Sequence, residues 1–161
     1  MTEKEIIAKG LKLKWTGVFD LNELYRKIKF WLEWRGYGNE KDLEKLYVER
    51  IKPGGKQLEI KWEGANEVST HVKAVIEITF FVTGLQDVEV QKAGKTVKLK
   101  KGDIEMRFNA YLLLDIPSGF LGKIYKRFVL KKELDGYKID LYDDLYDLHD
   151  EVRGYLTLQR F

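Results

Sequence analysis

The sequence of 161 residues contains no cysteine, two histidines and two prolines. Without cysteine, disulfides and thiolate metal sites are excluded, and two histidines leave little basis for zinc chemistry. No run of apolar residues approaches the length that crosses a bilayer. The first ten residues, MTEKEIIAKG, carry acidic side chains and lack the apolar centre of a secretion signal. We therefore expect a protein that is cytoplasmic and not transmembrane.

The composition fits one globular unit with a substantial core. Hydrophobic residues make up 44% of the chain, and 161 residues favour a single α+β domain over residues 1–161. Charged residues make up 34%, but 29 basic and 26 acidic side chains nearly cancel to a net charge of +3. Abundant lysine and glutamate with few asparagines and glutamines are typical of a thermophile.

A period of two predicts the strands. Apolar and polar residues alternate over residues 11–19 and again through most of residues 43–116. Turn signals at Pro53-Gly54-Gly55, Gly84, Ala93-Gly94 and Lys101-Gly102 separate segments that are too close together for helical crossovers, and we count six strands in the second region. We therefore predict an antiparallel sheet of about seven strands with one apolar face.

A period of 3.6 predicts three helices. Asp20 is the expected N-cap of a helix that ends near Arg35, with Glu23 completing a capping box and Gly36 as the C-cap. After Pro117 we expect two C-terminal helices packed on the sheet, with Gly136 between them. Their apolar positions are Leu121, Ile124, Tyr125 and Phe128 in the first, and Leu141, Leu145, Leu148, Val152 and Tyr155 or Leu156 in the second.

The order of strand, helix, antiparallel meander and helical C-terminus resembles the helix-grip layout of START and related SRPBCC domains. That resemblance implies a curved sheet that wraps a C-terminal helix around an apolar cavity. The stretches LYRKIKFWLEWRGYG and ERIKPGGKQLEIKWEG are also similar to stretches of archaeal proteins without an assigned function.

The apolar face of the predicted sheet is the place to look for a ligand. By alternation this face carries no titratable side chain, so we expect no catalytic residue, no metal and no cofactor, and no enzyme activity. The favoured function is binding of an apolar small molecule or lipid, and the alternative is a protein-interaction or membrane-surface module with a packed core. The expected ligand-binding residues are Trp62, Ile76, Ile78, Phe80, Met106, Phe108, Leu112 and Phe128.

Neither the two histidines nor the acidic C-terminal region is expected to form a metal site. His71 is expected on the polar face of a strand, and His149 follows Asp147. Asp143, Asp147 and Glu151 repeat at a spacing of four residues, which places them on one helix face, and His149 points elsewhere. A solvated acidic face is favoured over a cation site.

Lysines near the expected turns raise nucleic acid as a partner. If the strands meander in order, the turns at Pro53-Gly54 and Lys101-Gly102 lie at the same end of the sheet and gather five lysines. No row of exposed aromatic residues is interleaved with them, so nucleic acid is disfavoured. The five are Lys52, Lys56, Lys98, Lys100 and Lys101.

Residues 119–132, GFLGKIYKRFVLKK, contain five cations and no acid, and the cations alternate with apolar side chains that include Phe120, Leu121, Ile124, Phe128 and Val129. We expect a helix that buries its apolar side against the sheet, with contact to a protein partner or a membrane surface as the alternative.

The first helix carries three more aromatic residues than one buried face requires. Phe30, Trp34 and Tyr37 spread onto a flank of this helix. They would pack on a second side, close the mouth of a pocket or form an interface, and packing on two sides is favoured.

Overall fold

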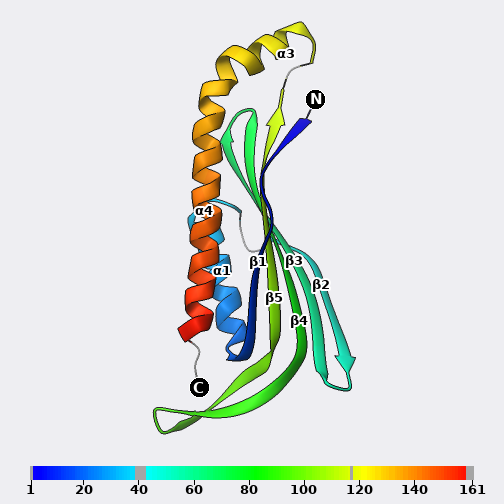
Figure 1. Cartoon of the computed structure of the whole chain (residues 1–161), viewed down its shortest axis with the longest axis vertical. Helices are drawn as coiled ribbons and strands as arrows, with labels where there is room; N and C mark the ends of the chain where they lie inside the picture. The colour runs from blue at the N-terminus through cyan, green and yellow to red at the C-terminus, as the bar shows by residue number, and fades with distance from the viewer. Residues whose placement is uncertain (1, 39–42, 117, 159–161) are drawn as a thin grey trace.

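The computed structural model describes residues 2–38, 43–116 and 118–158 (Figure 1). The fold is α+β, as predicted, with one antiparallel sheet in the order β1-β5-β4-β3-β2. The strands are β1 (Thr2–Phe19), β2 (Glu44–Lys52), β3 (Gly55–Ser69), β4 (Val72–Lys92) and β5 (Lys95–Asp115). The helical segments are α1 (Leu21–Trp34), α3 (Phe120–Ile124), η1 (Tyr125–Leu130) and α4 (Lys131–Leu158).

The predicted count of about seven strands is wrong, because two glycines read as turns lie inside long strands. Gly84 has φ +62° and sits at a bulge, where the β4–β5 register shifts between Thr83 and Gln86. At Gly102 a Cβ atom would lie 3.0 Å from the carbonyl oxygen of Thr83. A glycine inside a strand often marks a bulge or a close backbone approach. β4 and β5 therefore run for 21 residues each.

The first strand begins well before residue 11, where the sequence pattern predicted it. β1 pairs with β5 from Thr2 onward, but the register shifts between Ile6 and Ala8 and again between Ala8 and Leu11. Gly10, with φ +70°, lies in the second irregularity. These bulges break the alternation of apolar and polar residues, which is why the pattern is visible only from Leu11.

The predicted ends of α1 are confirmed. The Asp20 carboxylate accepts a hydrogen bond from the Glu23 backbone N–H at 3.0 Å. At the other end, Gly36 has φ +85°, and the backbone N–H of Tyr37 donates to the carbonyl of Leu32 at 2.8 Å. Together with the bond from the Gly36 N–H to the Glu33 carbonyl at 3.1 Å, this is a Schellman motif.

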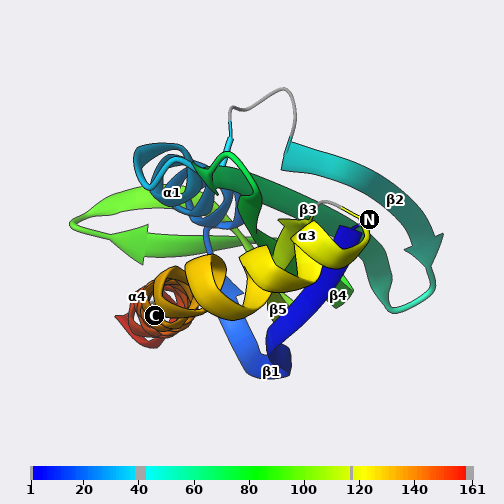
Figure 2. The ribbon, with the colours of Figure 1, turned by 90° about the horizontal axis from the view of Figure 1, so that it is seen from above.

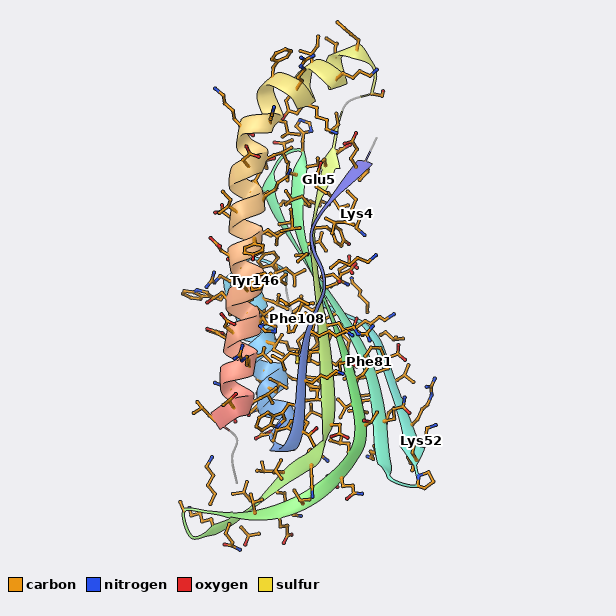
Figure 3. The ribbon with its side chains drawn as sticks, viewed as in Figure 1. Lys4, Glu5, Lys52, Phe81, Phe108 and Tyr146 are labelled. Atoms are coloured by element: carbon orange, nitrogen blue, oxygen red, sulfur yellow. The ribbon has the colours of Figure 1, made fainter. Side chains whose placement is uncertain are left out.

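Both long helices lie on one side of the sheet (Figure 2), and the apolar face is directed toward them, as predicted. Figure 3 shows Phe108 between the sheet and α4, whereas Phe81 and Lys4 lie on the opposite side. The sheet supplies one side of the core, and each helix supplies the other side with a row of buried side chains. These buried residues are Leu21, Leu24, Ile28, Trp31 and Leu32 of α1, and Leu134, Leu141, Leu145, Leu148, Val152, Tyr155 and Leu156 of α4.

No helix of the described part covers the opposite face of the sheet, although it carries apolar residues (Figure 2). Long side chains of the sheet itself provide the cover. The Lys4 ammonium lies 3.9 Å from the centre of the Tyr111 ring, and the Arg107 guanidinium lies 5.8 Å from the centre of the Phe81 ring. The Tyr111 hydroxyl donates to Glu77 at 3.0 Å.

The predicted division of the C-terminal region at Gly136 is wrong. α4 continues through Gly136, and the irregularity lies earlier, in η1, which is a turn of π-helix. Inward-facing positions therefore step by five residues, from the half-buried Tyr125 to the buried Leu130, before the α-helical spacing resumes at Leu134. The extra residue rotates Phe128 away from the sheet.

Candidate functional site

Seven of the eight predicted ligand-binding residues lie together in the packed core. Each is at most 2% exposed, and no charged or polar side chain among the described residues is buried with them. Tyr25, Trp62 and Phe80 form an aromatic cluster with ring centroids 5.2 to 5.6 Å apart. None of the seven lines the surface hollows described below. The seven are Trp62, Ile76, Ile78, Phe80, Met106, Phe108 and Leu112.

Phe128, the eighth predicted residue, is not near the other seven. It lies on η1 with its side chain 67% exposed. The prediction that residues 119–132 bury their apolar side against the sheet is therefore wrong for this residue and for its neighbours on α3. For Phe128 the physical reason is the five-residue step of the π-helical turn, which a search for a 3.6-residue period does not detect.

A groove with a volume of about 580 Å³ lies between α1 and α4. Its floor includes Ile28, Trp31 and Val152, and its rim carries Phe30 and Trp34. The last two rings are stacked, with centroids 6.1 Å apart, and Trp34 is 76% exposed. Of the three aromatic residues expected on the flank of α1, these two are exposed.

Tyr37, the third of that set, is buried and belongs to a polar clamp that joins α1 to α4. Its hydroxyl donates to Asp144 at 2.7 Å, and burial, followed by this hydrogen bond, raises the pKa of the phenol. Arg35 bonds Asp144 at 2.8 Å and Asp147 at 2.6 Å, and the Trp31 indole donates to Asp147 at 3.3 Å. Part of the predicted acidic face therefore holds the two helices together.

The two histidines have structural contacts. The ring of His149 meets that of Phe108 edge-on at 5.5 Å, and its Nε2 lies 3.2 Å from the Lys12 carbonyl, which assigns the Nε2 proton to this bond. His71 lies in the turn between β3 and β4 and contacts Tyr125. Within residues 2–38, 43–116 and 118–158, no group of three or more histidine and acidic side chains is placed to hold a metal ion.

The lysines near the expected turns are partly neutralised. Lys56 pairs with Glu49 at 2.9 Å, and Lys100 pairs with Asp87. The expected turn at Lys101-Gly102 does not exist, because both residues lie within β5. The nucleic-acid hypothesis depends on two adjacent turns that carry these lysines, and one of the two turns is absent.

The tip of the molecule, residues 120–130, consists of α3 and η1. Figure 1 shows it at one end of the long axis, bent away from the direction of α4. Several of its apolar side chains are directed to solvent: Phe120 and Leu121 are each 76% exposed, and Ile124 is also exposed. Together with Phe128, they form an apolar outer face with no covering element among the described residues.

Cations line the adjacent side of the same segment. A hollow of about 330 Å³ is lined by Lys123, Lys126, Arg127, Lys131 and Leu134. Lys126 pairs with Glu3 on β1, and the Arg127 guanidinium lies 5.5 Å from the centre of the Phe128 ring. In the described part of the chain, Lys123, Arg127 and Lys131 have no carboxylate within ion-pair distance.

Contacts on the inner side hold the tip in place. The Tyr125 ring meets His71 edge-on at 5.3 Å, Leu130 is completely buried, and Gly122 is buried. The ion pair from Lys126 to Glu3 adds a link to the edge strand. The exposed apolar face is therefore carried by an anchored segment and not by a free end.

No helix in the part of the chain that the structure describes is long and apolar enough to cross a membrane. No family model matches the sequence, and no curated protein matches it.

Proposed function

We propose that the chain is a non-enzymatic membrane-surface module that binds an anionic bilayer through its tip. The observation that carries this proposal is the solvent-directed apolar face of Phe120, Leu121, Ile124 and Phe128, flanked by basic side chains. A helix with an apolar face beside lysine and arginine lies in the interface of a bilayer, with its apolar side at the acyl boundary.

The energetic terms favour this partner. Full burial of a large apolar side chain contributes roughly 1.5 to 3 kcal/mol, and four such side chains are available at the tip. Each cation near an anionic surface adds about 1 kcal/mol. Residues 119–132 contain no acid that would be repelled by the lipid headgroups. The partner that complements this surface is both apolar and negatively charged.

Co-sedimentation with lipid vesicles tests the proposal. The wild type should sediment with vesicles that contain phosphatidylserine and remain in the supernatant with phosphatidylcholine alone. Phe128→Ser should weaken binding by about tenfold or more, because it removes an inserting ring. Ile51→Ser is the matched control, since Ile51 is 85% exposed on β2 and outside the tip. Equal binding of both variants, or no sedimentation of the wild type, would contradict the proposal.

A second candidate function is binding of an apolar small molecule. In this case the binding site is the groove between α1 and α4, and not the core in which the sequence predicted it. The specific observation is a hollow of about 580 Å³ with an exposed Phe30–Trp34 pair at its rim. Clefts of this volume suit small ligands. Native mass spectrometry before and after organic extraction would detect a carried ligand, and Trp34→Ala should reduce its occupancy.

The resemblance to helix-grip domains is likewise a proposal. Its support is the position of α4, which lies along the apolar face of a curved antiparallel sheet (Figure 1). The filled core between them supports a variant of that layout in which the internal cavity has closed and binding has moved to the surface.

A further inference from the structure

We infer that the basic hollow at the tip binds the phosphate group of a lipid headgroup and selects headgroups that carry a phosphomonoester. This inference rests on the proposed membrane function and adds the chemical class that the tip prefers. The hollow is lined by Lys123, Lys126, Arg127 and Lys131, with Leu134 closing it toward α4.

The charge of the hollow is positive. Four cations line it and no carboxylate does, while one of them, Lys126, is neutralised by Glu3. Three cations remain for a ligand. A phosphomonoester carries between one and a half and two negative charges near neutral pH and presents three acceptor oxygens, whereas the phosphodiester of a simple lipid carries one charge. Several cations around one hollow therefore favour the more highly charged group.

The donors that line the hollow suit phosphate oxygens. Arg127 can form two parallel hydrogen bonds to phosphate oxygens, and the lysines act as point charges around them. The Phe128 ring, 5.5 Å from the guanidinium carbon, restricts where the Arg127 head can lie. A cation held in this way loses less freedom when it binds an anion.

The hollow lies beside the apolar face of the tip. Lys123 and Arg127 alternate along the tip with Ile124 and Phe128, so the cations and the inserting side chains belong to the same two turns. When the apolar face reaches the acyl boundary, the adjacent cations are at the level of the headgroups, where lysine and arginine stems extend their charges. The hollow then faces lipid phosphate rather than bulk solvent.

The ion pair between Lys126 and Glu3 has a defined place in this scheme. It connects the floor of the hollow to the edge strand β1, and Lys138 on α4 forms a second link to that strand through Glu5 at 3.6 Å. These contacts fix the hollow relative to the sheet. The cations free to bind phosphate are therefore presented by an ordered segment.

Vesicles of matched surface charge test the inference. Wild-type protein should bind vesicles with phosphatidic acid about fivefold or more tightly than vesicles whose phosphatidylserine content gives the same zeta potential. Lys131→Gln and Arg127→Gln should abolish this preference while leaving measurable binding to phosphatidylserine. Lys132→Gln is the matched control, because it removes one charge beside the hollow without lining it, and should weaken binding to both vesicles by the same factor.

The outcomes separate this inference from the proposed function. Equal binding at matched charge, or equal loss of the preference in Lys131→Gln and Lys132→Gln, would overturn phosphomonoester selection while the membrane function stands. Binding to neither vesicle would overturn both. Inorganic phosphate at millimolar concentration should compete only weakly. Full displacement by it, or tighter binding to a soluble phosphopeptide than to vesicles, would overturn the assignment to a lipid headgroup.

Discussion

The ring of Tyr125 meets the imidazole of His71 edge-on, with centroids 5.3 Å apart and planes inclined by 70°. This contact joins η1 to the turn between β3 and β4. Tyr125 therefore marks the inner side of the π-helical turn. Phe128, three residues further along the chain, lies on the outer side. Phe128 is exposed for this reason, and it is part of the surface that we propose binds a membrane.

Two phenylalanines of opposite environment give the first prediction. Phe108→Ala removes a completely buried ring and should lower the free energy of unfolding by about 3 to 5 kcal/mol. Phe128→Ala removes an exposed ring and should change it by less than about 0.5 kcal/mol. Urea unfolding of both variants measures the difference. A large loss in Phe128→Ala would mean that this ring is buried in solution.

The N-cap of α1 gives the second prediction. Asp20→Ala removes the acceptor of the Glu23 backbone N–H and should cost about 0.5 to 2 kcal/mol in chemical unfolding. Asp20→Asn should retain most of that stability, because the amide oxygen also caps. Asn22→Ala, on the exposed side of the same turn, serves as the control. Equal stability of Asp20→Ala and the control would place the start of the helix elsewhere.

The clamp between the helices gives the third prediction. Arg35→Ala breaks both bonds to Asp144 and Asp147 and should cost about 1 kcal/mol, since the arginine is partly solvated. Arg35→Lys should recover only part of this loss, because an ammonium cannot reproduce two bonds from a planar fork. Thermal unfolding measures the effect, with the exposed Arg50→Ala as control. Full recovery by lysine would show that only charge matters here.

The phenols give the fourth prediction, which concerns pH. Burial raises the pKa of Tyr25, Tyr37, Tyr111 and Tyr155 above the ordinary value of 10, and hydrogen bonds to acidic side chains add to the effect in the last three. A raised pKa means that the folded state holds the proton more tightly. The stabilisation is therefore complete below about pH 10 and is lost as the pH rises above it.

Urea unfolding at a series of alkaline pH values checks this expectation. Stability should be level from neutral pH to about pH 10 and then fall, with tyrosinate absorbance increasing as the protein unfolds. Tyr37→Phe should fall less steeply with pH than the wild type. A wild-type stability that stays constant above pH 10 would contradict the burial of these phenols.

The sequence was sufficient to predict the α+β class, the antiparallel sheet, the apolar face and both ends of α1. These features depend on local rules: alternation at Ile76 and Ile78, a side-chain cap at Asp20, a left-handed residue at Gly36. Strand number was not predictable in the same way. Gly84 is a residue type that is common in turns, but β4 pairs with β5 on both sides of it. Such pairing depends on contacts between residues that are distant in sequence.

The tip was misassigned for a related reason. The cations and apolar residues of 119–132 were visible in the sequence, and the membrane surface was among the alternatives. For Phe128, burial or exposure depends on one additional residue in the helical turn between Tyr125 and Leu130, and a period of 3.6 assigns this ring to the wrong side. The signal available in advance was the run of cations without any acid, which a core-facing helix does not require.

Fluorophores attached to single cysteines test the membrane assignment most directly, because the natural chain contains no cysteine. One environment-sensitive label is placed at Phe128→Cys and another at Ile51→Cys, which precedes Lys52 at the far end of the molecule (Figure 3). On anionic vesicles, the label at 128 should shift to the blue and be quenched by a quencher within the bilayer, while the label at 51 should not change. Identical responses at the two positions, or no response at 128, would contradict insertion of the tip.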